Sequence, residues 1–246
     1  MILAAPAYAQ QPPAMKPADT EVWTPEPKVI TPGAMNSDAP SDAIVLFGGK
    51  NNTLNEWVNA KGEAAGWTLG DGLFTVNKKA GDIKTKRAFR NYQLHIEWRI
   101  PSDISGKDQA RGNSGVYLGA NDSTGYELQI LDSYVNKTYV NGQAASIYKQ
   151  SAPLVNASRR PGEWQAYDVL WTAPVFQADG SLSRPAHVTV FHNGIVVQND
   201  FVLRGGTEYI GMPAYKAHGA LPLLLQAHGD PSAPISFRNI WIRELQ

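Results

Sequence analysis

The feature that most constrains this chain is a succession of short alternating apolar and polar runs, separated by turn dipeptides, from Ala43 to the C-terminus. Residues 67–76 contain an Asp-Gly pair at Asp71, and residues 188–197 contain an Asn-Gly pair at Asn193. Both pairs favour the positive φ angles of a tight hairpin turn. No segment has a sustained 3.6-residue period, so we expect few and short helices. The pattern predicts an all-β sandwich or jelly roll.

The composition agrees with this fold class and excludes several functions. The 22 Gly and 17 Pro residues suit many strands joined by turns. The 22 Lys and Arg residues balance the 22 Asp and Glu residues, which argues against a nucleic-acid partner. The chain has no cysteine, so thiolate metal sites and cysteine nucleophiles are excluded. After the N-terminus, no stretch approaches the roughly 18 apolar residues of a transmembrane helix, and we expect no membrane insertion.

The N-terminal part of the chain differs from the rest. Residues 1–10 resemble the end of a secretory signal peptide, with Ala7-Tyr8-Ala9 as the cleavage pattern, which predicts a periplasmic or secreted protein. Residues 11–42 are rich in proline and have almost no periodic pattern of apolar residues, which predicts an extended, partly disordered arm. We expect residues 43–246 to form one domain, because all-β folds often reach this size undivided.

Polar residues recur in phase on three further expected strands. Successive side chains of a strand point to opposite faces of its sheet, so parity assigns each residue to one face. Further strands are expected at residues 92–100, 115–118, 126–131, 164–171, 221–227 and 235–244. The polar residues that lie in phase are Glu97 and Arg99 on the first of these strands, Glu127 and Gln129 on the third, and Gln226 and His228 on the fifth.

If these three strands lie in one curved sheet, their polar faces combine into a concave surface suited to a sugar. The alternative is that each polar face simply meets water, as in an ordinary antiparallel sheet. The residue types favour a sugar site, because carboxylates, amides and aromatic groups such as Tyr117 suit carbohydrate recognition. Asn113 precedes an expected strand and is predicted at the cleft rim. Motifs for a nucleophile elbow, a phosphate-binding loop and a zinc-binding helix are absent from the sequence.

Several stretches resemble the family of 3-keto-disaccharide hydrolase domains. Asn91-Tyr-Gln-Leu-His-Ile-Glu-Trp-Arg99, Tyr126-Glu-Leu-Gln-Ile-Leu-Asp132 and Leu223-Leu-Leu-Gln-Ala-His-Gly229 carry the likeness, together with residues 45–50, 113–117, 153–164 and 237–240. The resemblance implies a concanavalin A-like jelly-roll sandwich of two curved antiparallel sheets. It also implies a substrate that is a glycoside or disaccharide oxidised at C3 of the sugar.

The chemistry of such a substrate sets what the site must supply. A C3 ketone acidifies the C2 proton, so a general base can remove it and the enolate expels the C1 substituent, after which water adds back. This route requires a base, an enolate stabiliser and a proton donor for the leaving group. We expect Glu127 and His228 to act as base and acid, in either order, with Glu97 beside them. The residues expected to bind the substrate are Arg99, Gln129, Gln226, Tyr117 and Asn113.

Other roles stay open at this point. A divalent cation could replace Arg99 as the electrophile, held by Glu127 and His228 or Glu97, although no ligand spacing requires one. No other cofactor is expected. A conventional glycosidase would use Glu97 and Glu127 as acid and nucleophile. A non-catalytic carbohydrate-binding module is the third reading, since fold does not determine function. The partner is a small saccharide in each case, and a homo-oligomer is left open.

Overall fold

The structure, a computed structural model, describes residues 14–121 and 125–245. The chain divides into two compact units, Met1–Ile30 and Thr31–Gln246. In the first unit residues 14–29 are exposed and contain one short 3-10 helix, η1 (Pro17–Thr20), and Ile30 is half-buried. The predicted signal remnant, residues 1–10, lies outside the described residues. No helix in the described part of the chain is long and apolar enough to cross a membrane.

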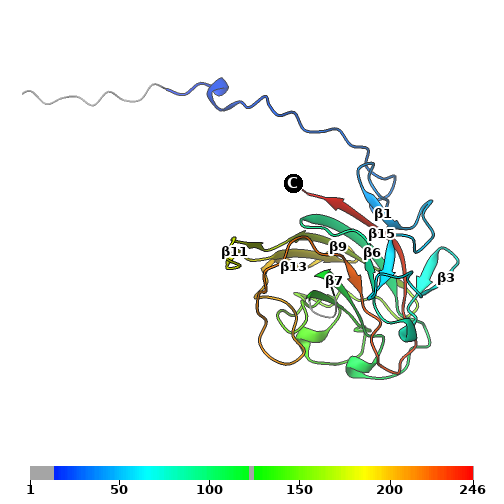
Figure 1. The fold of residues 1–246 in the computed structure, drawn as a ribbon. Coiled ribbons are helices and arrows are strands. Elements are labelled where there is room, and N and C mark those ends of the chain that lie inside the picture. The colour runs from blue at the N-terminus through cyan, green and yellow to red at the C-terminus, as the bar shows by residue number, and fades with distance from the viewer. Residues whose placement is uncertain (1–13, 122–124, 246) are drawn as a thin grey trace, which may run out of the picture. The chain divides into compact units, whose positions relative to one another are not determined.

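The second unit is an all-β sandwich, as predicted. Its larger sheet has eight antiparallel strands, and Figure 1 shows β6, β9, β13 and β15 running together in this layer. The strand order is β13 (Ile195–Val202), β12 (His187–His192), β9 (Trp164–Thr172), β6 (Tyr92–Arg99), β15 (Ser236–Glu244), β4 (Leu73–Thr75) and β3 (Thr68–Gly70), with β1 (Ile44–Phe47) paired to β15.

The second layer is a five-stranded antiparallel sheet. Its order is β2 (Trp57–Asn59), β5 (Ile83–Thr85), β14 (Leu224–Leu225), β7 (Ser114–Ala120) and β8 (Gly125–Ile130). A two-stranded ribbon, β10 (Val175–Phe176) and β11 (Leu182–Arg184), completes the strands of the described residues. The remaining helices are single 3-10 turns, namely η2 (Lys78–Ala80), η3 (Asp108–Ala110) and η4 (Val140–Gly142).

The two predicted hairpins are confirmed. Asp71 and Gly72 have φ angles of 51° and 72° between β3 and β4. Asn193 and Gly194 have φ angles of 52° and 81° between β12 and β13. Positive φ at both central residues is the requirement of the type I′ turn, and Asn, Asp and Gly tolerate it best. Each dipeptide therefore fixes the register between the two strands of its hairpin.

The core lies between the sheets and is formed by the apolar faces that parity predicts. Ile96 and Trp98 of β6 are fully buried, as are Leu128 of β8 and Leu223 and Leu225 around β14. Burying side chains of this size stabilises the fold by roughly 1.5–3 kcal/mol each. The opposite face of the five-stranded sheet carries its polar residues together with a small apolar cluster that includes Tyr117 and Leu224, and this face carries the site.

The strand predicted at residues 221–227 is shorter in the structure, where β14 spans only Leu224–Leu225. Pro222 has no backbone N–H, and the N–H of Leu223 donates to the side-chain hydroxyl of Thr85 in β5 rather than to a main-chain carbonyl, so the regular ladder does not begin before Leu224. After β14, Gln226 N–H still donates to the Gly115 carbonyl at 3.0 Å. The chain therefore stays extended beyond the strand, and the predicted alternation of faces continues to His228.

Candidate active site

The polar face of the five-stranded sheet carries a cleft of about 910 Å³. All of the predicted site residues except Glu97 and Arg99 line it. Their strands bring them together because β7, β8 and β14 are neighbours in this sheet. The predicted residues in the cleft are Asn113, Tyr117, Glu127, Gln129, Gln226 and His228.

The prediction that Glu97 and Arg99 converge with Glu127 is wrong. Both come from β6, which is a central strand of the other sheet. Glu97 accepts hydrogen bonds there from Arg238 at 2.6 Å and Asn239 at 2.9 Å, and Arg99 stacks on a tryptophan ring. Parity assigned Glu97 correctly to a polar face, but that face lies on the far side of the sandwich. The two glutamates therefore share no cleft.

Glu127 is the buried carboxyl group of the cleft, with a residue exposure of 4%. It projects from β8 opposite Tyr117 of β7, and the Tyr117 hydroxyl donates a hydrogen bond to its carboxylate. Burial raises the pKa of Glu127 to about 8; the bond from Tyr117 opposes this shift, and the negative charge of Asp82 adds to it. The carboxyl group is therefore mainly neutral at pH 7 and can donate a hydrogen bond.

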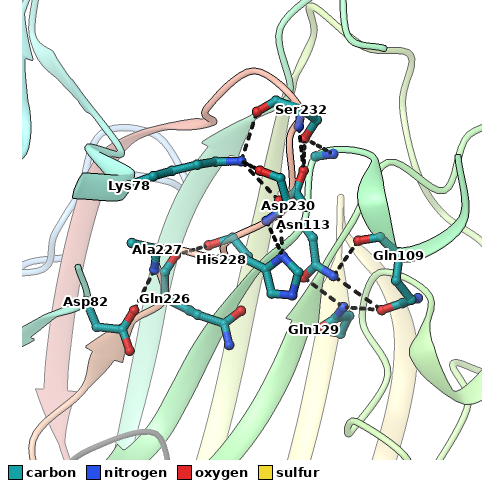
Figure 2. Close-up of polar contacts among 12 residues, drawn as sticks. Lys78, Asp82, Gln109, Asn113, Gln129, Gln226, Ala227, His228, Asp230 and Ser232 are labelled. Atoms are coloured by element: carbon teal, nitrogen blue, oxygen red, sulfur yellow. Dashed lines mark hydrogen bonds and ion pairs between the residues drawn. The ribbon is translucent and has the colours of Figure 1, made fainter. Parts of the chain in front are cut away.

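His228 follows β14 and is held by an acidic residue. Figure 2 shows the imidazole with Nδ1 directed at Asp230, whose carboxylate oxygen lies 3.1 Å away. Asp230 also accepts hydrogen bonds from Lys78 Nζ at 3.1 Å and from the Ser232 amide at 2.8 Å. Burial alone would raise the pKa of Asp230, but the bonds from His228, Ser232 and Lys78 hold it well below its usual range.

An ionised Asp230 fixes the orientation of the histidine. Nδ1 lies 3.1 Å from the Asp230 carboxylate and 3.2 Å from the Asp230 main-chain nitrogen. The negative charge of Asp230 favours the tautomer with the proton on Nδ1, in which the ring donates to the carboxylate and Nε2 is left as an acceptor for the cleft. Lys78 adds stiffness, because its Nζ also donates to the main-chain carbonyls of Asp230 and Ser232 at 2.6 and 2.8 Å. The arrangement is that of a general base with an orienting carboxylate.

Amide groups line the space between Glu127 and His228. Gln129 donates to Asn113 Oδ1 at 3.2 Å and to Gln109 Oε1 at 3.1 Å, and Gln226 donates to the Tyr117 hydroxyl at 3.3 Å. The Oε1 atoms of both Gln129 and Gln226 are buried without a hydrogen-bond partner among the described residues. Buried acceptors rarely stay unsatisfied. Sugar hydroxyls are suitable donors for them.

One wall of the cleft is aromatic, and sequence reasoning missed it. We call Tyr139, Tyr148 and Tyr209 the tyrosine wall, and all three line the cleft together with Lys149. The Tyr139 and Tyr148 hydroxyls lie 2.5 Å apart. These residues lie in loops after β8 and after β13, where no period predicts direction. By contrast, Asp230 stands two residues after His228, and this spacing could have indicated the pair.

A divalent cation would find two of its three predicted ligands in this cleft. Glu127 and His228 both line it, whereas Glu97 is on the other sheet. Within residues 14–121 and 125–245, no three His, Asp or Glu side chains form a group that could hold a metal ion. The cation stays a prediction, and a chelator tests it directly.

The fold and the cleft together define a carbohydrate-active enzyme of the β-sandwich class. Residues 42–243 match the family described as the 3-keto-alpha-glucoside-1,2-lyase-like domain, and the chain belongs to this family. The resemblance found in the sequence is thereby confirmed. No curated protein shows significant similarity to this chain.

Solved structures agree with this assignment. A protein of Parabacteroides distasonis ATCC 8503 named "putative glycosyl hydrolase" is 55% identical, with a TM-score of 0.87 over 94% of this chain and 97% of its own. A second protein of that name and organism is 20% identical, with a TM-score of 0.60 over 83% of this chain and 94% of its own. The second likeness concerns the fold alone.

Proposed function

We propose that this protein cleaves a glycoside whose sugar is oxidised at C3, by removal of the C2 proton and elimination of the C1 substituent, with water addition completing net hydrolysis. The observation that carries the proposal is one cleft that combines an Asp230-oriented His228 with a buried Glu127. Membership of the 3-keto-alpha-glucoside-1,2-lyase-like family supports the choice of substrate.

His228 is the general base of this proposal. Its Nε2 faces the cleft and takes the C2 proton, and the imidazolium that forms is stabilised by the Asp230 carboxylate 3.1 Å from Nδ1. The ion pair between Lys78 and Asp230, at 3.1 Å, keeps that carboxylate in place during proton transfer. His228 is thereby assigned the base role that the sequence left open between it and Glu127.

Glu127 then stabilises the developing enolate. As the C2 proton leaves, negative charge moves to the C3 oxygen, and a neutral carboxyl group can donate a hydrogen bond to it. Burial keeps Glu127 in this form because it raises the pKa to about 8. A carboxylic acid kept neutral by an apolar site is an established kind of oxyanion stabiliser. Gln129 and Gln226 bind substrate hydroxyls through their buried acceptor oxygens.

Product analysis by NMR tests the proposal. Purified protein is incubated with a 3-keto disaccharide and, separately, with its unoxidised parent, with and without chelator. We expect cleavage of the keto sugar alone, lost in Glu127→Ala and His228→Ala. Cleavage of the parent would favour a conventional glycosidase, and binding without cleavage would favour a carbohydrate-binding module. Loss of activity with chelator and recovery with one divalent ion would establish the cation.

The site of action is also proposed as periplasmic or extracellular. The support is the signal-like pattern Ala7-Tyr8-Ala9 in the sequence. N-terminal sequencing of the mature native protein tests it, and we expect a start close to Gln10.

A further inference from the structure

The elimination proposed above needs a third group, a proton donor for the leaving oxygen. The proposed function assigns His228 to the C2 proton and Glu127 to the C3 oxygen, and a separate donor for the leaving oxygen would complete the site. Lys149 is the remaining cation of the cleft lining, which it shares with Glu127 and His228. Its place in the fold, its surroundings and its backbone conformation all single it out.

Lys149 is surrounded by aromatic rings rather than by carboxylates. Its Nζ lies 4.4 Å from the ring centre of Tyr209, 5.7 Å from that of Tyr148 and 5.9 Å from that of Tyr139. The Tyr209 carbonyl accepts one hydrogen bond from Nζ at 2.5 Å. No carboxylate pairs with Lys149 in the part of the chain that the structure describes. Two of the three ammonium protons are therefore left for other acceptors.

The backbone holds Lys149 in this place at an energetic cost. Its φ angle is +58°, a left-handed conformation that is strained for a lysine, and Ala145 in the same loop has φ of +66°. The Lys149 N–H donates to the Asn141 carbonyl at 2.8 Å. The preceding residue, Tyr148, donates its N–H to the main-chain carbonyl of Glu127 at 3.1 Å. The strained turn is thus fastened directly to the strand that carries Glu127.

Two residues of the tyrosine wall keep a large exposed surface at the cleft. Tyr209 is 72% exposed and Tyr139 is 41% exposed, although both are large aromatic residues. Exposed aromatic faces at a cleft mark a surface that binds another ring. A second sugar or an aromatic group stacked there would bring its linking oxygen toward the ammonium of Lys149.

We propose that Lys149 donates the proton to the leaving oxygen and that the tyrosine wall is the subsite for the leaving group. His228 takes the C2 proton, the C1–C2 double bond forms, and the C1–O bond breaks with its electron pair going to oxygen. That oxygen takes a proton from the Lys149 ammonium, and the neutral amine is reprotonated from water. This inference rests on the proposed function and assigns a residue to its third requirement.

The test uses three 3-keto glucosides that differ in leaving group: methanol, glucose and 4-nitrophenol. The nitrophenolate leaves without protonation, whereas the other two need a proton. We expect Lys149→Met to lower kcat about 100-fold for the methyl and glucosyl substrates and by less than about threefold for the nitrophenyl one. Arginine keeps the positive charge but holds its proton much more tightly than lysine. Lys149→Arg should therefore be as slow as Lys149→Met on the methyl and glucosyl substrates.

Controls separate this role from a structural one. Lys61→Met changes an exposed lysine outside the cleft and should leave all three rates unchanged. Met meets the same backbone strain as Lys at position 149, so the unfolding temperature should fall by no more than about a few degrees, which reflects the lost Nζ contacts with the Tyr209 carbonyl and the tyrosine rings. An equal loss on all three substrates, full recovery by Lys149→Arg, or no loss at all would overturn the inference. A wild-type protein inactive on all three would overturn the proposed function itself, and the inference with it.

Discussion

The carboxyl group of Glu127 occupies the space that a side chain at Gly115 would fill. A β-carbon at Gly115 would lie 2.6 Å from Glu127 Oε1 and 3.1 Å from its Cγ. Gly115 has no positive φ angle, so its backbone would accept another residue. A glycine is required at this position for steric reasons, because the Glu127 side chain lies directly over the Gly115 Cα on the face of the sheet that carries the cleft.

Gly115→Ala should therefore displace Glu127 and reduce activity more than stability. We expect a free-energy loss of about 1–3 kcal/mol, typical of overpacking, and at least a tenfold fall in kcat/KM on a 3-keto glycoside, of the order that a displaced proton-transfer group costs. Gly70→Ala is the matched control, because nothing lies within 4 Å of a β-carbon there. Steady-state kinetics and urea unfolding measure both quantities. Equal activity of the two variants would contradict the positioning role of Gly115.

Glu127→Gln should change how stability depends on pH. Burial raises the pKa of Glu127 from an ordinary 4.5 to about 8. Between these values the unfolded chain releases a proton that the folded chain keeps, so the free energy of unfolding falls as pH rises. Gln does not titrate. The free energy of unfolding of the variant, relative to that of the wild type, should therefore rise by up to a few kcal/mol between pH 4.5 and 8 and stay constant above pH 8.

Urea unfolding at several pH values checks this behaviour. Parallel curves for wild type and variant would show that Glu127 ionises normally. The activity of the wild type should also decline above about pH 8, because the neutral carboxyl group that serves the enolate is lost there.

Asp230→Asn should lower kcat by about 100-fold or more with little change in KM, since the histidine loses its orienting carboxylate and its tautomer preference. Asp200→Asn is a close control. Asp200 pairs with His187 at 3.0 Å, but this His–Asp pair is on the surface, outside the cleft. Kinetics of both variants on one 3-keto glycoside decide the matter. A loss in Asp230→Asn no larger than in the control would remove Asp230 from the proposal.

Asp168→Asn should destabilise the fold at low pH rather than at high pH. Burial works to lower the pKa of His95, but hydrogen bonds to Asp168 at 2.6 Å and to Glu97 raise it to about 9. A histidine with a raised pKa stabilises the fold fully below its ordinary 6.5, and this contribution is lost as pH rises through 9.

We expect a loss of about 1–3 kcal/mol at pH 6, the range for a hydrogen bond to a charged group, and much less at pH 10. Thermal or urea unfolding at the two pH values measures it, with Asp103→Asn as an exposed control outside the sheet. A loss that is the same at both pH values would mean that His95 is neutral in the folded protein.

Much of the fold followed from local patterns. The Asp71-Gly72 and Asn193-Gly194 pairs predicted both hairpins, because positive φ is a property of these residues themselves. Parity predicted that Glu127 and Gln129 point away from the core, because side chains alternate along a strand whatever its partners are. The same rule placed Gln226 and His228 correctly, even though the regular strand ends at Leu225.

What the sequence by itself determined, then, is which face of its own strand each residue occupies, and where the chain turns. Only the tertiary structure decided which strands share a sheet. Glu97 and Glu127 are the same residue type with the same parity, yet β6 and β8 lie in different sheets. Strand pairing is set by contacts far apart in sequence, so no local pattern records it. The same reason hid Lys149, whose position depends on a loop fastened to β8.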